Sequence, residues 1–284
     1  VGGRNRVFFN TGEGEFRQEQ IHPRLPAILN TAILADFNGD SRADLIAVDA
    51  RSHRLFLLSG MGDRGRFTEP QSCWPGLITL PSVMTAGDID GDGDLDLFIG
   101  QYKQPYVKGQ MPTPYYDAND GYPAYLFQND GSGIFTDITE QAGLGQKRFR
   151  RSYGASFVDL NEDGKFDLLV SSDFAGIDVY EGNGHGMFKE VTNGWIDQRH
   201  TFGMSHVFAD FNTDGKLDFF SVGMSSTTGR RLELMGLGRD EHKHIDAMRS
   251  SMSYGNRLYF ATESGFEQPS FNDQVSRTGW SWGC

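Results

Sequence analysis

Four short segments of the sequence carry acidic or amide side chains at their first, third, fifth and ninth positions. The most acidic runs from 88 to 96 as DIDGDGDLD, with five aspartates in nine residues. Carboxylates this close together repel one another unless a cation lies among them. Side chains at the first, third, fifth and ninth positions, with the backbone carbonyl of the seventh, can surround one ion where glycines let the chain curl. Because all these donors are oxygens, the segment predicts a Ca²⁺ site.

The same spacing recurs at 36–44, 159–167 and 210–218. An EF-hand loop would end in a glutamate at its twelfth position and would be flanked by helices. The twelfth residues here are Ala47, Ile99, Val170 and Ser221, which excludes that class of site. An apolar run follows each ninth-position aspartate and is typical of a buried strand. The loops therefore join strands.

Composition is consistent with this interpretation. The chain has 284 residues, 38% hydrophobic and 13% aromatic, with 36 glycines, as expected for many short strands and tight turns. Fifteen of the 38 acidic residues lie in the four loops, so four bound Ca²⁺ ions would reduce the net charge from −12 to −4.

There is no basic field to bind nucleic acid and no run long enough for a transmembrane helix. Loops of this type suit millimolar calcium, so we expect a secreted, cell-surface or periplasmic protein. The two cysteines, Cys73 and Cys284, could form a disulfide.

A second signature follows the loops: an apolar strand, a turn rich in glycine, and a phenylalanine that opens another strand. It ends at Phe16, Phe67, Phe135, Phe188 and Phe266, and its turn chemistry indicates hairpins. One unit is thus a four-stranded antiparallel blade with the calcium loop between its first and second strands. Repeated units of about 50 residues predict an all-β fold, a β-propeller. We place the blades at 1–20 (partial), 30–70, 80–140, 152–193, 202–268 and 278–284 (partial) of a single domain.

The predicted blades at the two ends of the sequence are incomplete. The spacing from each hairpin phenylalanine to the next loop predicts a further loop between 286 and 290, and the first hairpin lacks inner strands. We therefore interpret the chain as a segment of a longer propeller. The alternative is a five-bladed ring closed by residues 279–284 and the first hairpin.

Two blades carry insertions, at 101–123 and 223–255, between their second and third strands. In an antiparallel blade this connection lies at the end opposite the calcium loop, so both insertions share one face. The first is rich in tyrosine and proline, as binding loops are. The second contains a helical spacing over 240–252. A basic run, 147–151, passes the same face. The candidate partner-binding residues are Tyr102, Tyr106, Tyr115, Tyr116, Lys147, Arg148, Arg150 and Arg151.

The loop pattern followed by an apolar strand resembles the FG-GAP/VCBS repeat of integrin α-subunit propellers and secreted bacterial proteins. The segments 256–259 (NRLY) and 277–283 (RTGWSWG) are similar to the ASPIC/UnbV, or cartilage acidic protein-like, type. The resemblance implies about seven blades and a role in adhesion or recognition. It also implies side-chain ligands at four positions of each loop and carbonyl ligands at Arg42, Asp94, Lys165 and Lys216. The side-chain ligands are Asp36, Asn38, Asp40, Asp44, Asp88, Asp90, Asp92, Asp96, Asp159, Asn161, Asp163, Asp167, Asp210, Asn212, Asp214 and Asp218. Ser41 stands where the family usually has glycine.

The leading hypothesis is a calcium-stabilised propeller that binds a protein or glycan through the face with the insertions. An enzyme of the polysaccharide lyase or hydrolase type using that face is the first alternative, and a subunit of a cell-envelope assembly is the second. Asp240, Glu241, His242 and His244 could bind a transition metal, but a solvated helix start is the simpler interpretation. His206 fits a core or channel position better than a catalytic base. We expect the calcium ions to stabilise the fold and not to catalyse a reaction.

Overall fold

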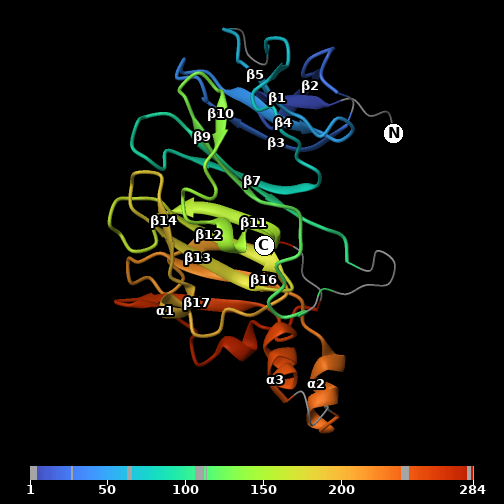
Figure 1. Ribbon diagram of the computed structural model, residues 1–284, viewed down its shortest axis with the longest axis vertical. Helices are drawn as coiled ribbons and strands as arrows, with labels where there is room; N and C mark the ends of the chain where they lie inside the picture. Colours follow the sequence, from blue (N-terminus) through green and yellow to red (C-terminus); the bar gives the residue numbers. More distant parts are fainter. Residues whose placement is uncertain are drawn as a thin grey trace.

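The computed structural model describes residues 5–26, 28–62, 66–105, 112, 114–237, 243–279 and 283. Four antiparallel sheets of four strands and one two-stranded hairpin follow one another along the long axis of the molecule (Figure 1). Within every sheet the strands are ordered as they occur in the chain, so each sheet is a simple meander. These sheets agree with the blades predicted from the sequence.

The strand bounds follow the repeat. The hairpin pairs β1 (Arg6–Gly12) with β2 (Glu15–Gln20). The first sheet contains β3 (Leu29–Ala35), β4 (Asp44–Asp49), β5 (Leu55–Leu58) and β6 (Gln71–Ser72). The second contains β7 (Pro81–Gly87), β8 (Asp96–Gln101), β9 (Tyr125–Asn129) and β10 (Phe135–Asp137). The third contains β11 (Arg151–Val158), β12 (Asp167–Asp173), β13 (Gly176–Gly182) and β14 (Phe188–Glu190). The fourth contains β15 (Gly203–Ala209), β16 (Asp218–Gly223), β17 (Arg257–Thr262) and β18 (Gly265–Glu267).

The sheets pack face to face, with the first strands of successive sheets in contact: β3 with β7, β7 with β11, and β11 with β15. The second strands are apolar on both faces because a sheet lies on each side. Leu97 and Ile99 of β8 belong to the core shared with the first sheet, whereas Phe98 belongs to the core shared with the third. Their alternation explains why these strands read as continuous apolar runs in the sequence.

Few helices accompany the sheets. They are α1 (Thr192–Trp195), α2 (Thr227–Leu234), α3 (Lys243–Met252) and two short 3₁₀ turns, Gly145–Lys147 and Asn272–Gln274. The helix expected over 240–252 is found as α3, but α2 was not anticipated. It contains Gly229, and glycine has a low helix propensity. A Cβ at this position would lie 2.7 Å from Ser253 Oγ, so a larger residue would clash there. None of the helices in the described ranges has the length and apolarity to span a bilayer.

One predicted hairpin is formed, but its outer strand begins later than predicted. In the first sheet, β5 pairs with Gln71–Ser72 and not with a strand opened by Phe67. Phe67 forms only an isolated bridge with Gly60. The Thr68 amide donates to the Ser59 carbonyl at 2.9 Å and the Met61 amide donates to the Arg66 carbonyl at 2.8 Å, while the Ser59 amide donates to the Thr68 hydroxyl at 2.9 Å instead of to a carbonyl. The blade therefore extends past residue 70.

Candidate functional site

The four acidic loops all lie between the first and second strands of a sheet, as the sequence predicted. The fourth and sixth residues of every loop have left-handed φ values: 71° and 64° in the first loop, 80° and 93° in the second, 60° and 80° in the third, and 62° and 87° in the fourth. Ser41 adopts this conformation in the first loop without being glycine. The four loops therefore share one backbone path.

The first aspartate of each loop shapes this path by accepting backbone hydrogen bonds. Asp36 Oδ1 accepts from the Asp40 amide at 3.2 Å, and its Oδ2 accepts from the Ser41 amide at 2.7 Å. Asp159 and Asp210 make the same two bonds at 2.8 to 3.1 Å. The loop curls around this carboxylate, which brings the side-chain oxygens of the following loop residues toward it.

The ninth aspartate of each loop, Asp44, Asp96, Asp167 or Asp218, is fully buried at 0% exposure. Asp96 Oδ2 accepts from the Ile89 amide at 3.1 Å, and its Oδ1 accepts from the Asn129 amide at 2.9 Å. The other three aspartates bind the second residue of their loop and the end of the third strand in the same way. This residue thus ties each loop to its own sheet, whatever else it binds.

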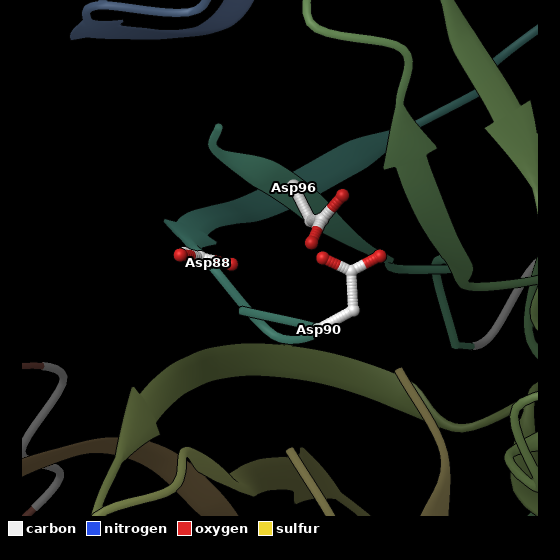
Figure 2. A group of neighbouring side chains, drawn as sticks. All are labelled: Asp88, Asp90 and Asp96. Carbon is white, nitrogen blue, oxygen red and sulfur yellow. The ribbon is translucent and has the colours of Figure 1, made fainter. Parts of the chain in front are cut away.

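The second loop brings three carboxylates together. Oxygens of Asp88, Asp90 and Asp96 lie within 4.8 Å of one another, and Figure 2 shows the Asp90 and Asp96 carboxylates directed toward each other with Asp88 beside them. Burial, partly opposed by its two backbone hydrogen bonds, raises the pKa of Asp96 to about 7. Burial and the neighbouring aspartates raise the pKa of Asp94 to about 6. A divalent cation would relieve the repulsion, so these residues fit calcium.

The other three loops differ in charge. Their third residue is Asn38, Asn161 or Asn212, whose amide oxygen can ligate without adding charge. In the first and third loops the seventh side chain pairs with the fifth: Arg42 with Asp40 at 3.5 Å, and Lys165 with Asp163 at 2.9 Å. The seventh residue of the second loop is an aspartate. We therefore expect the second loop to attract a cation most strongly.

Some predicted partner residues lie inside the protein. Tyr102 is only 5% exposed; its hydroxyl donates to Asp173 Oδ2 at 2.9 Å and its ring stacks on Tyr153 at 4.3 Å. Arg150 and Arg151 are 4% and 3% exposed. The prediction that the basic run is exposed is therefore wrong for these two arginines. Each of them is buried and forms an ion pair inside the protein.

The basic run instead holds the first insertion against the third sheet. Asp178 of β13 is surrounded by three cations: Lys147 Nζ at 2.6 Å, Arg150 Nε at 3.0 Å and Arg199 Nη1 at 3.4 Å. Arg150 and Arg199 also bind Asp117 of the insertion, at 2.6 and 3.1 Å. Burial alone would raise the pKa of Asp178, but the three cations hold it below its usual value.

Arg148 and Arg151 complete this anchoring. Arg148 pairs with Asp137 at 3.3 Å and with Glu140 at 2.9 Å. Arg151 pairs with Asp120 of the insertion at 2.8 Å and donates to the Lys103 carbonyl at 2.7 Å. The predicted basic run therefore positions a loop, which is a structural task.

Two predicted tyrosines remain at the end that carries the insertions. Tyr115 and Tyr116 are half-buried, and their rings meet edge to face at 5.8 Å. Tyr116 also contacts His200, whose pKa burial and then Arg199 lower to about 4. The two insertions are linked here: the Ala118 amide donates to the Phe174 carbonyl, the Phe174 ring meets Phe202 edge to face, and the Phe202 amide donates to the carbonyl of Met252 in α3.

Several other predictions fall on residues that lie outside the described ranges. These are Tyr106, the metal-binding alternative at Asp240, Glu241 and His242, the side chain of His244, and Cys284. Cys73 is buried in the core between the first two sheets, where burial raises the pKa of its thiol to about 12. The disulfide therefore stays a prediction.

Sequence reasoning missed Asp178, Arg199 and Asp117. An aspartate within the apolar strand β13 was a visible sign of a buried polar contact, but its partners come from two other segments, the basic run and Arg199. His206 is confirmed as an internal residue: its ring nitrogens bind Ser156 Oγ and Ser171 Oγ, each at 2.9 Å, and burial lowers its pKa to about 4.

Comparison with known proteins agrees with this geometry. A model of the FG-GAP-like repeat matches residues 36–99 and 159–221, which contain all four loops. Cartilage acidic protein 1 of Xenopus tropicalis is 29% identical over 135 residues, and that of Mus musculus is 25% identical over 127 residues. Each match covers 44% of this chain and 19% of the relative, so the chain matches a small part of those proteins.

A solved structure described as an Agrocybe aegerita lectin that recognises non-reducing terminal N-acetylglucosamine aligns over 99% of this chain and 77% of its own. The TM-score is 0.41 and the identity 14%, which is too low to imply a shared ligand. The repeat match and the weak homology to cartilage acidic protein 1 confirm the resemblance inferred from the loops. The chain therefore contains FG-GAP-like repeats at residues 36–99 and 159–221.

Proposed function

We propose that this chain is a calcium-stabilised recognition module of a secreted, cell-surface or periplasmic protein, and that it binds a protein or glycan partner. The observation that carries the proposal is the common geometry of the four loops. Each has the same curled backbone at the same end of its sheet, and in the second loop three carboxylates converge. Four equivalent loops are better suited to fixing four sheets than to catalysing one reaction. FG-GAP-like repeats are typical of extracellular recognition modules, which supports the same assignment.

Calcium would be held by the residues predicted from the sequence, from Asp36 in the first loop to Asp218 in the fourth. When bound, the ion supplies charge neutralisation and cross-links between the start and end of each loop. The protein's own bonds to the ninth aspartate already position one ligand. The ions thus stabilise the loop end of the sheets and leave the other end for recognition.

The partner surface would lie at the end that carries the insertions, centred on the half-buried Tyr115 and Tyr116. The tyrosines are fixed by ring contacts, so they would lose little conformational entropy on binding. The enzyme alternative gains no support from His206, because only burial shifts its pKa and its two hydrogen-bond partners are serines.

The test combines calcium titration with partner capture. Isothermal titration of metal-free protein should show about four Ca²⁺ bound, and calcium should raise the melting temperature. Capture from an extracellular protein and glycan preparation should then fall for Tyr115→Ala/Tyr116→Ala but not for Phe149→Ala, an exposed neighbour on the same face. Failure to bind calcium, or capture that is unaffected by the tyrosine substitutions, would contradict the corresponding half of the proposal.

A further inference from the structure

The turns that join the third and fourth strands differ in length between the sheets. Residues 130–134 join β9 to β10 and residues 183–187 join β13 to β14, whereas only residues 263–264 join β17 to β18. The two longer turns reach the calcium loop of the preceding sheet. The Gly186 amide donates to the Ile89 carbonyl at 3.0 Å, and Asn129 at the start of its turn donates through Nδ2 to the Phe37 carbonyl at 2.8 Å.

A cleft of about 320 Å³ lies where the short turn of the fourth sheet faces the calcium loop of the third. The third loop contributes Asn161 and Glu162, and the fourth loop contributes Lys216. The short turn contributes Thr262, Glu263 and Ser264, and Trp195 of α1 completes the wall. The volume falls at the lower end of the range of roughly 300–1,000 Å³ that is typical of small-ligand sites.

Trp195 is held firmly in this wall. Its amide donates to the Val191 carbonyl at 3.1 Å, and the next residue, Ile196, forms a parallel bridge with Phe266 of β18. Gly265 packs so closely that a Cβ there would lie 2.5 Å from the Trp195 carbonyl oxygen. A second hollow, lined by Glu181, Lys189 and Asn193 among others, shares Trp195 and Ser264 with the cleft. Trp195 therefore lines both hollows, and its partly buried side chain also packs against the core between the third and fourth sheets.

The corresponding junction between the second and third sheets is built without an aromatic residue. There the Phe188 amide donates to the Ala142 carbonyl at 2.8 Å. This contact is equivalent to the bridge between Ile196 and Phe266 at the junction of the third and fourth sheets. The residue before Ala142 is Gln141, where the third junction has Trp195. The short turn and the tryptophan thus occur together at one junction, which indicates a site and not a general feature of the repeat.

We propose that this cleft binds the end of a neutral saccharide chain. The part of the indole left exposed at the cleft would offer an apolar surface to the C–H face of a sugar ring, and the packing of the rest against the core would lower the entropy cost of binding. Glu162 and Glu263 can accept hydrogen bonds from sugar hydroxyls, and Thr262 and Ser264 can both donate and accept, while the Asn161 NH2 group can donate when its oxygen ligates calcium. This arrangement of one aromatic platform and several short polar groups matches a ligand that carries hydroxyls on every side.

The net negative charge of the cleft wall disfavours anionic small ligands. The two glutamates outnumber the single lysine on the cleft wall, so a phosphate-bearing nucleotide would be repelled. The site lies at the calcium-loop end and is separate from the tyrosines of the proposed partner surface. The saccharide site therefore goes beyond the proposed function, and either one can fail without the other.

Saturation-transfer difference NMR on calcium-loaded protein would test the inference. The probes are glucose, galactose, mannose, N-acetylglucosamine and their β-linked disaccharides at millimolar concentration, with a glycine tripeptide and AMP as competing classes. We expect at least one sugar to bind, and Trp195→Ala to weaken that sugar about tenfold or more. Trp195→Phe retains a ring and should weaken it only about two- to fivefold. Trp74→Phe, a tryptophan packed against Tyr125 and Phe127, is the matched control and should leave the affinity unchanged.

A second variant tests the cleft without touching the tryptophan. Replacing residues 263–264 by the five-residue turn of the third sheet, NGHGM, should fill the cleft and abolish sugar binding, while thermal melting shows that the protein still folds. The proposal is overturned if no sugar in the panel binds the folded protein. It is also overturned if sugar binding survives both Trp195→Ala and the turn replacement, or if the tripeptide or AMP binds there instead.

Discussion

Replacing the ninth aspartate of the second loop by alanine should destabilise the protein even when no calcium is present. Asp96 is fully buried and accepts hydrogen bonds from the amides of Ile89 and Asn129. Each amide left without an acceptor costs about 1–3 kcal/mol. The lost desolvation cost of the carboxylate offsets part of this, so we expect a net loss of about 2–4 kcal/mol in the free energy of unfolding.

The matched control is Asp92→Ala in the same loop. Asp92 is exposed and accepts one hydrogen bond, from the Asp94 amide at 3.1 Å. In chelator its loss should change the free energy of unfolding by no more than about 0.5 kcal/mol. In calcium both variants should lose the stabilisation that this site provides.

Urea denaturation of the wild type and both variants, in chelator and in saturating calcium, would measure these differences. The result that refutes the reasoning is an Asp96→Ala protein that unfolds in chelator at the same urea concentration as the wild type. The ninth aspartate would then be only a calcium ligand and not a tie between the loop and the third strand. An equal loss for Asp92→Ala in chelator would refute it as well.

Three further predictions concern calcium, pH and the buried ion network. With free calcium about fivefold above the dissociation constant, each site contributes about 1 kcal/mol, so four sites add about 4 kcal/mol, and calorimetric melting with and without chelator should reveal the difference. Because burial raises the folded-state pKa values of Asp96 and Asp167 to about 7 and about 6, their contribution to metal-free stability is full below the unfolded pKa of about 4 and is lost as pH rises through 6–7. Metal-free protein should thus melt at a higher temperature at pH 5.5 than at pH 8, and a melting temperature that rises with pH would contradict this. Asp178→Ala leaves three cations without their shared carboxylate and should lower the free energy of unfolding by about 3–5 kcal/mol. Glu190→Ala removes a partly exposed partner of Lys147 and should lower it by at most about 1 kcal/mol in the same urea assay.

Local spacing predicted most of the acidic-loop end of this protein. Positions one to nine of each loop are close in the chain, so the geometry depends on the backbone conformations that glycine and its substitutes allow. Ser41, Glu162 and Thr213 show that other residues can take the same left-handed conformation. The spacing did not show that Asp96 would bind the third strand, because Asn129 lies 33 positions away.

The opposite end of the sheets could not be predicted in the same way. Arg150 and Arg151 looked like exposed charges because a sequence shows how charged residues are spaced and not where their partners lie. Asp117, Asp178 and Arg199 come from three different segments, and only packing of the third sheet brings them around the basic run.

The sequence by itself determined the repeated strands, the acidic loops between them and the oxygen donors suited to a hard cation. These features are local and arise from periodicity, turn chemistry and the charge of neighbouring residues. Tertiary structure decided which charges are buried, how the insertion is anchored and where a short turn leaves a cleft beside Trp195. Those outcomes depend on contacts between segments far apart in the chain, whose distances no local pattern specifies.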